Sequence, residues 1–142
     1  MIERETLVSH LQTLLEVDRF KDYGPNGLQV EGRPQVRKVV TGVTASLALI
    51  DAAIELKADA ILVHHGLFWS PAHPWTGRRY ELIRLLVENG LAVYSQHLPL
   101  DAHPELGNNA RLGAVLGFRQ EGRAGDQELL AWGSLDAAET LA

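Results

Sequence analysis

The sequence predicts an α/β fold in which helices cover both faces of a mixed, mainly parallel sheet. A short run of branched apolar side chains at residues 60–63 is typical of a strand that is buried on both faces. A second strand is expected at residues 91–95, and a helical pattern at residues 78–89 separates the two. A helical crossover of this length makes the two strands parallel neighbours in one sheet.

The first third of the chain predicts a helix and a hairpin. Residues 2–17 carry leucines on one helical face, at positions 7, 11, 14 and 15. Gly-Pro-Asn-Gly at residues 24–27 is a strong turn signal, which we interpret as an element of the fold rather than of a site. Short strands at residues 28–30 and 38–43 are expected to pair as a hairpin at the start of the sheet.

The central helices have clear end signals. Ser46 can cap a helix that runs to about residue 57, and Gly90 can end the helix at residues 78–89. Residues 97–107 are expected to form a loop, because two prolines disfavour a regular helix or a central strand there. Asn108 or Asn109 can then cap a short helix.

The last residues predict a turn at residues 122–126, a strand at residues 129–135 and a new helix that begins at Asp136. That helix has only six residues before the sequence ends, too few for a stable helix. We therefore expect residues 1–119 to form an α/β unit that carries the site loops. Residues 120–142 are expected to begin a second half that is cut short.

Composition excludes several classes of function. The chain has 142 residues, no cysteine and a net charge of −5, so thiolate zinc sites and thiol nucleophiles are excluded and binding to nucleic acid is disfavoured. No apolar run approaches the length of a membrane span, and the acidic start is unlike a signal peptide. We expect a cytoplasmic protein with no membrane partner.

Two loops that carry imidazole and carboxylate groups are expected at one edge of the sheet. His64 and His65 follow the strand at residues 60–63, and His97 and Asp101 follow the strand at residues 91–95. Ligands of open α/β sheets bind outside the carboxyl ends of the strands. This set of side chains suits zinc, iron, nickel or manganese. The remaining histidines are interpreted as loop or surface residues, at positions 10, 73 and 103.

Consecutive histidines at a strand end are expected to diverge, so they suit two neighbouring ions better than one. Two metals about 3.5–4 Å apart can share a hydroxide and polarise a substrate oxygen, which is hydrolytic chemistry. Asp101 would balance charge, and His97 could be a ligand, orient a ligand or carry a proton. The alternative is that His64 and His65 cap backbone carbonyls without a metal.

Side chains near this edge have two interpretations each. Phe68, Trp69 and Trp75 could line a substrate pocket, although packing of their loop over the sheet is the preferred interpretation. Arg78 and Arg79 could contact a phosphate, although a solvated helix start is preferred. The glycine-rich phosphate-binding motifs, the G-x-S-x-G elbow and the H-E-x-x-H motif are absent from the sequence.

Four segments of the sequence resemble one known family. They read YGPNGLQVEG at residues 23–32, VTGVTAS at 40–46, ADAILVHHGLFW at 58–69 and HLPLDAHPELGNNA at 97–110. They resemble the NGG-interacting-factor-like family, whose bacterial members are often named GTP cyclohydrolase I type II homologs. The resemblance spans about residues 23–117.

The resemblance implies an α/β fold of which this chain is the N-terminal part, a ring-shaped homohexamer, and two divalent metal ions in each subunit. It implies that His64, His65 and Asp101 are metal ligands and that His97 lies beside the site. Family members are longer, and a histidine and a glutamate from their C-terminal half complete the site. Because both are missing from this sequence, we expect reduced metal occupancy.

Two functions remain open from the sequence. The first is a metal-dependent hydrolase whose metal-bound hydroxide attacks a nucleotide-like, phosphate or cyclic amide substrate, with His97 assisting proton transfer. The second is a non-catalytic metal-binding ring subunit that recruits a protein or nucleic acid. A third possibility is that the shortened chain keeps the fold and has lost the site. We favour the hydrolase, because open metal positions at a sheet edge suit a reaction.

Overall fold

The chain folds into two units, Met1–His97 and Leu98–Ala142, in a computed structural model that describes residues 1–69 and 73–137. Each unit has its own secondary structure and is described separately below. The candidate site residues divide between them, with His64, His65 and His97 in the first unit and Asp101 in the second.

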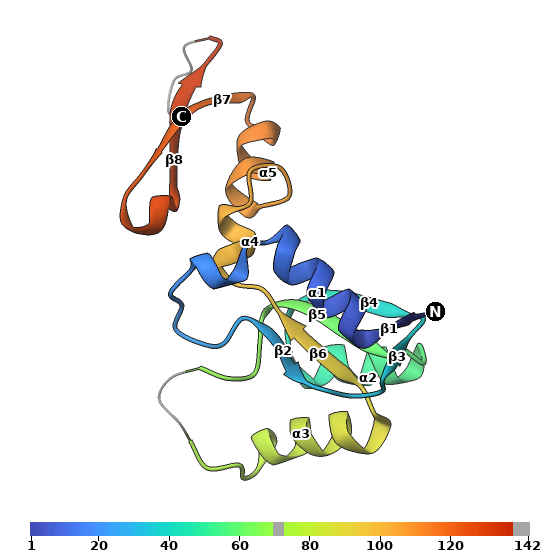
Figure 1. Cartoon of the computed structure of the whole chain (residues 1–142). Coiled ribbons are helices and arrows are strands. Elements are labelled where there is room, and N and C mark those ends of the chain that lie inside the picture. The colour runs from blue at the N-terminus through green and yellow to red at the C-terminus, as the bar shows by residue number, and fades with distance from the viewer. Residues whose placement is uncertain (70–72, 138–142) are drawn as a thin grey trace. The chain divides into compact units, whose positions relative to one another are not determined.

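A four-stranded sheet forms the centre of the first unit (Figure 1). Its strand order is β2 (Gly27–Val30), β6 (Ala92–Ser95), β5 (Ala60–His65) and β4 (Val39–Thr44). Strands β4, β5 and β6 are parallel, and β2 is antiparallel to β6. The prediction of a mixed, mainly parallel sheet is therefore confirmed.

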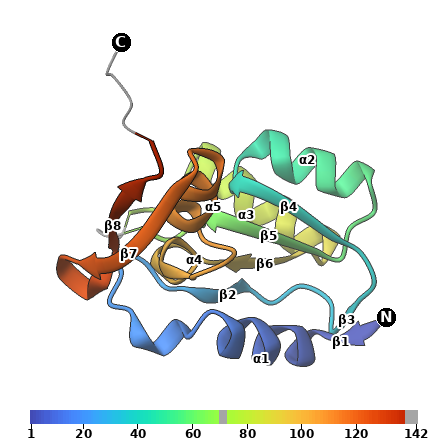
Figure 2. The same ribbon diagram turned by 90° about the horizontal axis from the view of Figure 1, so that it is seen from above.

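Helices cover both faces of this sheet (Figure 2). Helices α2 (Leu47–Glu55) and α3 (Arg78–Asn89) lie on one face, where Ile50, Ile61, Leu86 and Val93 are fully buried in the main core. Helix α1 (Arg4–Leu14) lies on the other face, where Leu7 packs on a smaller cluster around Ala60 and Ala92. The unit is thus an α/β/α layered structure, as the sequence predicts.

The end signals of the central helices are confirmed. The Ser46 hydroxyl accepts a hydrogen bond from the backbone N–H of Leu49 at 3.2 Å and caps α2. Gly90 ends α3 in the left-handed conformation, with φ of 58°. Helix α1 is shorter than predicted, because residues 2 and 3 form strand β1 (Ile2–Glu3) with β3 (Gln35–Val36), and a 3-10 turn at Val17–Arg19 follows the helix.

The predicted hairpin between residues 28–30 and 38–43 is wrong. Strand β2 pairs with β6 and strand β4 pairs with β5, so the two strands lie at opposite edges of the sheet. The reason is burial: β5 and β6 are apolar on both faces and occupy the centre, and each needs a partner on its outer side. If β2 and β4 paired with each other, β5 and β6 would each lack a hydrogen-bonding partner strand on the outer side.

The second unit contains α4 (Leu98–Ala102), α5 (Asn108–Val115), β7 (Phe118–Ala124) and β8 (Leu130–Leu135). The predicted loop at residues 97–107 is wrong at its start, because Pro99 lies in the first turn of α4, where proline's missing N–H costs no helical hydrogen bond. The predicted asparagine cap is also wrong. Gly107 is the N-cap residue of α5, and Asn108 lies inside the helix.

Strands β7 and β8 form an antiparallel hairpin. The turn predicted at residues 122–126 is wrong in position, because β7 continues to Ala124 and the reversal includes a 3-10 turn at Asp126–Glu128. The predicted final strand is confirmed as β8. The helix predicted after Asp136 lies almost wholly in residues 138–142, outside the described residues. The domain boundary near residue 119 stays a prediction.

Among the helices of the described residues, none is long and apolar enough to cross a bilayer.

A buried carboxylate ties the amino ends of the central strands together. Asp59, only 4% exposed, precedes β5 and accepts backbone N–H groups from Arg37 at 2.9 Å and Lys38 at 3.1 Å. The Arg33 guanidinium lies 3.4 Å from its other oxygen. Burial alone would raise the pKa of Asp59, but these hydrogen bonds and the nearby guanidinium groups outweigh burial and hold the pKa below its usual range.

Replacing this carboxylate should lower the free energy of unfolding at neutral pH. It should also reduce the loss of stability that occurs as the pH falls. Asp59→Ala removes hydrogen bonds to an ionised acceptor, so we expect a loss of about 2 kcal/mol at neutral pH in denaturant unfolding. Because the folded pKa is lowered, the stabilisation is present above the unfolded pKa and is lost as the pH falls through the folded value. Asp51→Ala, on the exposed side of α2, is the matched control. Equal stability of the two variants would contradict this role for Asp59.

Candidate metal centre

Four chain segments meet at one edge of the first unit's sheet. Strands β4, β5 and β6 are parallel, so their carboxyl ends share this edge, where Thr44 is paired with His65 and Val63 with Ser95. Strand β2 runs the other way and begins here, with Gly27 opposite Ser95. The loop before β2 therefore reaches the same edge as the histidines that end β5 and follow β6.

Three histidines converge at this edge. The ring centroids of His64 and His65 are 4.5 Å apart, and His97 lies 5.0 Å from His64 and 5.6 Å from His65. One ring nitrogen of each residue lies within 4.8 Å of the others, so the three could hold a metal ion. The side chains of His64 and His65 were expected to diverge, but their ring nitrogens lie close together.

Each of the three imidazoles has its Nδ1 atom in a hydrogen bond with another part of the edge. Nδ1 of His64 lies 2.9 Å from the backbone oxygen of Gln96, and Nδ1 of His65 lies 3.1 Å from the Thr44 hydroxyl. Nδ1 of His97 lies 2.9 Å from Oδ1 of Asp22. Carbonyl and carboxylate partners fix Nδ1 as the protonated nitrogen of His64 and His97. In the neutral form of each ring, Nε2 is then the atom with the lone pair that a metal or a proton needs.

Asp22 and Asn26 form a hydrogen-bonded support around His97. The Asp22 side chain is only 2% exposed and accepts the amide of Asn26 at 2.9 Å and the backbone N–H of Tyr23 at 2.7 Å. Asn26 in turn accepts the backbone N–H of His97 at 2.7 Å. Both the ring and the backbone of His97 are thus held by the loop before β2.

Asp22 was not predicted from the sequence as a residue of this edge, and Asn26 was not predicted to support His97. Asn26 belongs to the Gly-Pro-Asn-Gly turn, which we interpreted as a fold element only. The incorrect hairpin concealed the role of this loop, because only the antiparallel pairing of β2 with β6 brings the loop to the histidines. The sequence signal that could have indicated their role is the presence of two polar side chains, Asp22 and Asn26, in a turn directly before a strand.

Asp101 lies in the second unit, on α4, where the amide of Asn108 donates a hydrogen bond to its carboxylate at 2.6 Å. Its role as a metal ligand stays a prediction. Nδ1 of His103 accepts the backbone N–H groups of Glu105 and Leu106, at 3.2 and 3.0 Å, as expected of a loop residue.

The donor set fits a divalent transition metal. Imidazole is a ligand for zinc, iron, copper and nickel, and metal-bound histidines commonly donate their second N–H to a carbonyl or a carboxylate. His64 and His97 have that arrangement here. All three histidines are partly buried rather than exposed, which limits competition from bulk water.

Comparisons with known proteins identify relatives along the whole chain. A family model described as Duf34/NIF3 (NGG1p interacting factor 3) matches residues 2–142. A protein of Neisseria meningitidis serogroup A, named GTP cyclohydrolase 1 type 2 homolog, is 51% identical over 142 residues, which cover 99% of this chain and 57% of that protein. The protein of that name from Escherichia coli K12 is 53% identical over 117 residues, covering 82% of this chain and 47% of its own length. The chain spans about half the length of the curated relatives it matches.

A solved structure has the same fold. A structural-genomics structure described as protein ybgI, of unknown function, superimposes with a TM-score of 0.91 at 46% sequence identity. The match covers 96% of this chain and 55% of that one. The agreement supports the layered α/β architecture described above.

Removing one imidazole should weaken metal binding. In His64→Ala we expect the affinity for Zn²⁺ to fall about tenfold or more, because one of few ligands is lost. Competition with a chromophoric chelator measures this directly. His10→Ala, an exposed histidine on α1, is the matched control. If the two variants bound Zn²⁺ with equal affinity, the assignment of this edge as a metal centre would be wrong.

Proposed function

The chain belongs to the Duf34/NIF3 family. From that premise we propose that it acts as a metal-dependent hydrolase with a dinuclear centre of divalent ions. The substrate class we propose is nucleotide-like, phosphate or cyclic amide. The single observation that supports this most strongly is the convergence of three imidazoles whose Nδ1 atoms are already engaged. Oriented ring nitrogens of this kind suit metal binding, and turnover is what distinguishes the hydrolase from a non-catalytic metal-binding subunit.

In this proposal His64 and His65 hold the metals through Nε2, together with Asp101. Divalent ions bound there would lower the pKa of a water molecule and polarise a substrate oxygen. The family relatives are about twice as long as this chain, so further ligands from a longer protein are part of the proposal.

We assign His97 to proton transfer. Its Nδ1–H faces the buried carboxylate of Asp22, which orients the ring and favours the tautomer whose Nε2 can accept a proton. The two hydrogen bonds that join Asn26 to Asp22 and to the His97 backbone hold the ring in place. Nε2 of His97 would therefore accept a proton from the attacking water and return it to the leaving group.

We further propose that subunits assemble into a homohexameric ring, as the family resemblance implies. Large apolar side chains that lie exposed in the second unit support an interface there, namely Leu112, Val115, Leu116, Leu130 and Trp132. Light scattering after size exclusion tests this. A monomer at micromolar concentration would contradict assembly by this chain.

Metal content and turnover together test the hydrolase. We expect fewer than two equivalents of divalent metal per 142-residue chain after reconstitution and dialysis, because His64, His65 and Asp101 are few ligands for two ions, and close to two equivalents in a longer protein that supplies the further ligands; plasma mass spectrometry measures both. We also expect hydrolysis of a member of a phosphate, nucleotide and cyclic amide panel that a chelator abolishes. Metal with no turnover of any panel member would instead support a binding subunit.

A second variant distinguishes the two possible roles of His97, as a metal ligand or as a proton carrier. His97→Ala should retain the metal of the unsubstituted protein and lower turnover by about 10²-fold or more, the usual contribution of general acid–base catalysis. Asp22→Asn should lower turnover in the same direction, because the ring loses its carboxylate partner. Loss of metal from His97→Ala would show that His97 is a ligand, contrary to this assignment.

A further inference from the structure

A cavity of about 400 Å³ opens in the first unit beside the three histidines. Its walls come from the loop before β2 at residues 23–25, the loop after β5 at residues 67–69, and three side chains near the start of α3, namely His73, Trp75 and Arg79. This volume lies in the range of small-ligand pockets, about 300–1,000 Å³. The sequence favoured loop packing for Phe68, Trp69 and Trp75, and the structure shows a cavity that these side chains line.

The two loops that wall the cavity are fastened to each other without a ligand. The side-chain amide of Gln29 donates to the Pro25 carbonyl at 2.8 Å and accepts the backbone N–H of Leu67 at 2.7 Å. A Cβ atom on Gly24 would lie 2.2 Å from the carbonyl oxygen of Phe68, so only glycine permits this close approach. The cavity is therefore preformed rather than a gap between unconnected loops.

Aromatic rings dominate the lining and are held at fixed angles. Trp75 meets Phe68 edge-on, with ring centroids 5.4 Å apart and planes at 72°. The indole N–H of Trp69 donates to the Gly66 carbonyl at 2.9 Å. Trp69 and Trp75 nevertheless remain 37% and 42% exposed. Rigid indoles left in contact with water in a cavity offer faces on which a planar ring can stack.

Trp69 connects the cavity to the histidines. Its ring lies 5.1 Å from His97, with planes at 89°, and 6.2 Å from His65. A ring held against the cavity side of Trp69 would therefore have its edge close to the side chains assigned to metal binding and proton transfer.

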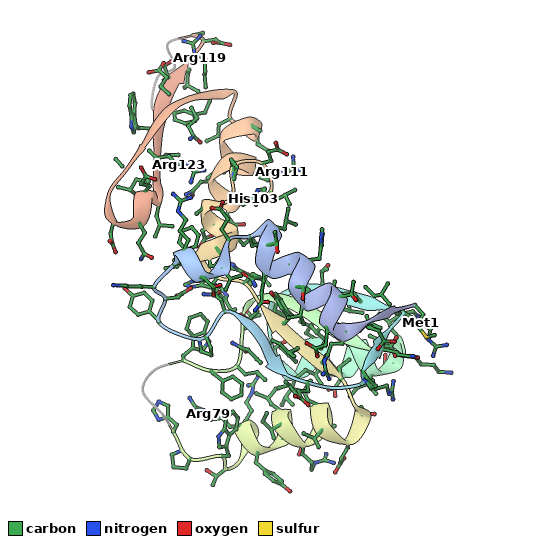
Figure 3. The ribbon with its side chains drawn as sticks, viewed as in Figure 1. Met1, Arg79, His103, Arg111, Arg119 and Arg123 are labelled. Carbon is green, nitrogen blue, oxygen red and sulfur yellow. The ribbon has the colours of Figure 1, made fainter. Side chains whose placement is uncertain are left out.

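The charge on the cavity wall is positive. Arg79 lies in the first turn of α3, where Figure 3 shows it at the start of that helix. Within the described part of the chain, no carboxylate pairs with the Arg79 guanidinium and no acidic side chain lines the cavity. Guanidinium groups bind phosphate and carboxylate groups with paired N–H donors. An anionic group on the ligand would meet its counter-charge here.

We propose that this cavity binds a planar heteroaromatic compound with an anionic group, its ring stacked on the indole of Trp75 and its anion on Arg79. The inference rests on the proposed hydrolase function and deepens it by naming the substrate class. It differs from the preferred sequence interpretation of Arg79 as a solvated residue, because the cavity gives the guanidinium a binding partner.

Tryptophan fluorescence tests the proposal with three probes. Guanosine 5′-monophosphate carries both ring and anion, guanosine carries the ring alone, and ribose 5-phosphate carries the anion alone. The titrations use the full chain with Trp132→Phe, which removes the one tryptophan of the second unit, and a chelator, which removes any contribution from metal. We expect guanosine 5′-monophosphate to quench the remaining indoles, and each partial probe to bind about tenfold more weakly.

Two variants assign the contacts. Arg79→Gln should weaken guanosine 5′-monophosphate about tenfold and leave guanosine unchanged, because only the charge-assisted contact is lost. Trp75→Ala should weaken both by about tenfold, because stacking is lost. Arg78→Gln removes a neighbouring exposed charge that does not line the cavity and should bind like the parent. All variants should keep the metal content of the parent.

The outcomes separate this inference from the proposed function. No binding of guanosine 5′-monophosphate, or equal binding by Arg79→Gln and Arg78→Gln, would overturn the cavity assignment even if the protein hydrolyses another substrate. Probe binding with the expected variant pattern but no turnover on any substrate would support the cavity and overturn the hydrolase.

Discussion

The pairing of β2 with β6 is the constraint on which the candidate site depends. Parallel strands bring only their carboxyl ends to one edge, which accounts for His64, His65 and His97. An antiparallel strand at the sheet's margin adds the loop before it to the same edge, and this loop supplies Asp22, Asn26 and one wall of the cavity. One mixed sheet thus assembles the ring nitrogens, their supports and a binding cavity.

The supports around the histidines explain how this edge could bind metal without large rearrangement. Imidazoles at a strand end can rotate, and a ligand site loses affinity when its members must be ordered on binding. Here a carbonyl, a hydroxyl and a buried carboxylate each hold one Nδ1 atom. The partners come from three different segments, so a change in any one segment would disturb a different ring.

The sequence predicted the central elements well, because their signals are local. Helix α3 has a glycine at its end, α2 has a serine at its start, and the strand before the two histidines is an apolar run. Strand pairing and cavities depend on residues far apart in the chain, so the hairpin was wrong and Asp22 was missed. Pro99 shows a further limit, because proline prevents a helix only beyond its first turn. The histidines of the candidate metal centre were predicted because adjacent polar side chains follow a buried apolar strand.

The central claim is that the three imidazoles present oriented Nε2 atoms to one space. Long-range ¹H–¹⁵N correlation spectra of the histidine rings, recorded before and after addition of Zn²⁺, test it most directly. The structure predicts Nδ1–H tautomers for His64 and His97 before metal is added, and a shift of the Nε2 resonances of His64 and His65 on addition. Unchanged Nε2 resonances, or Zn²⁺-induced shifts confined to the exposed histidines, would contradict the account.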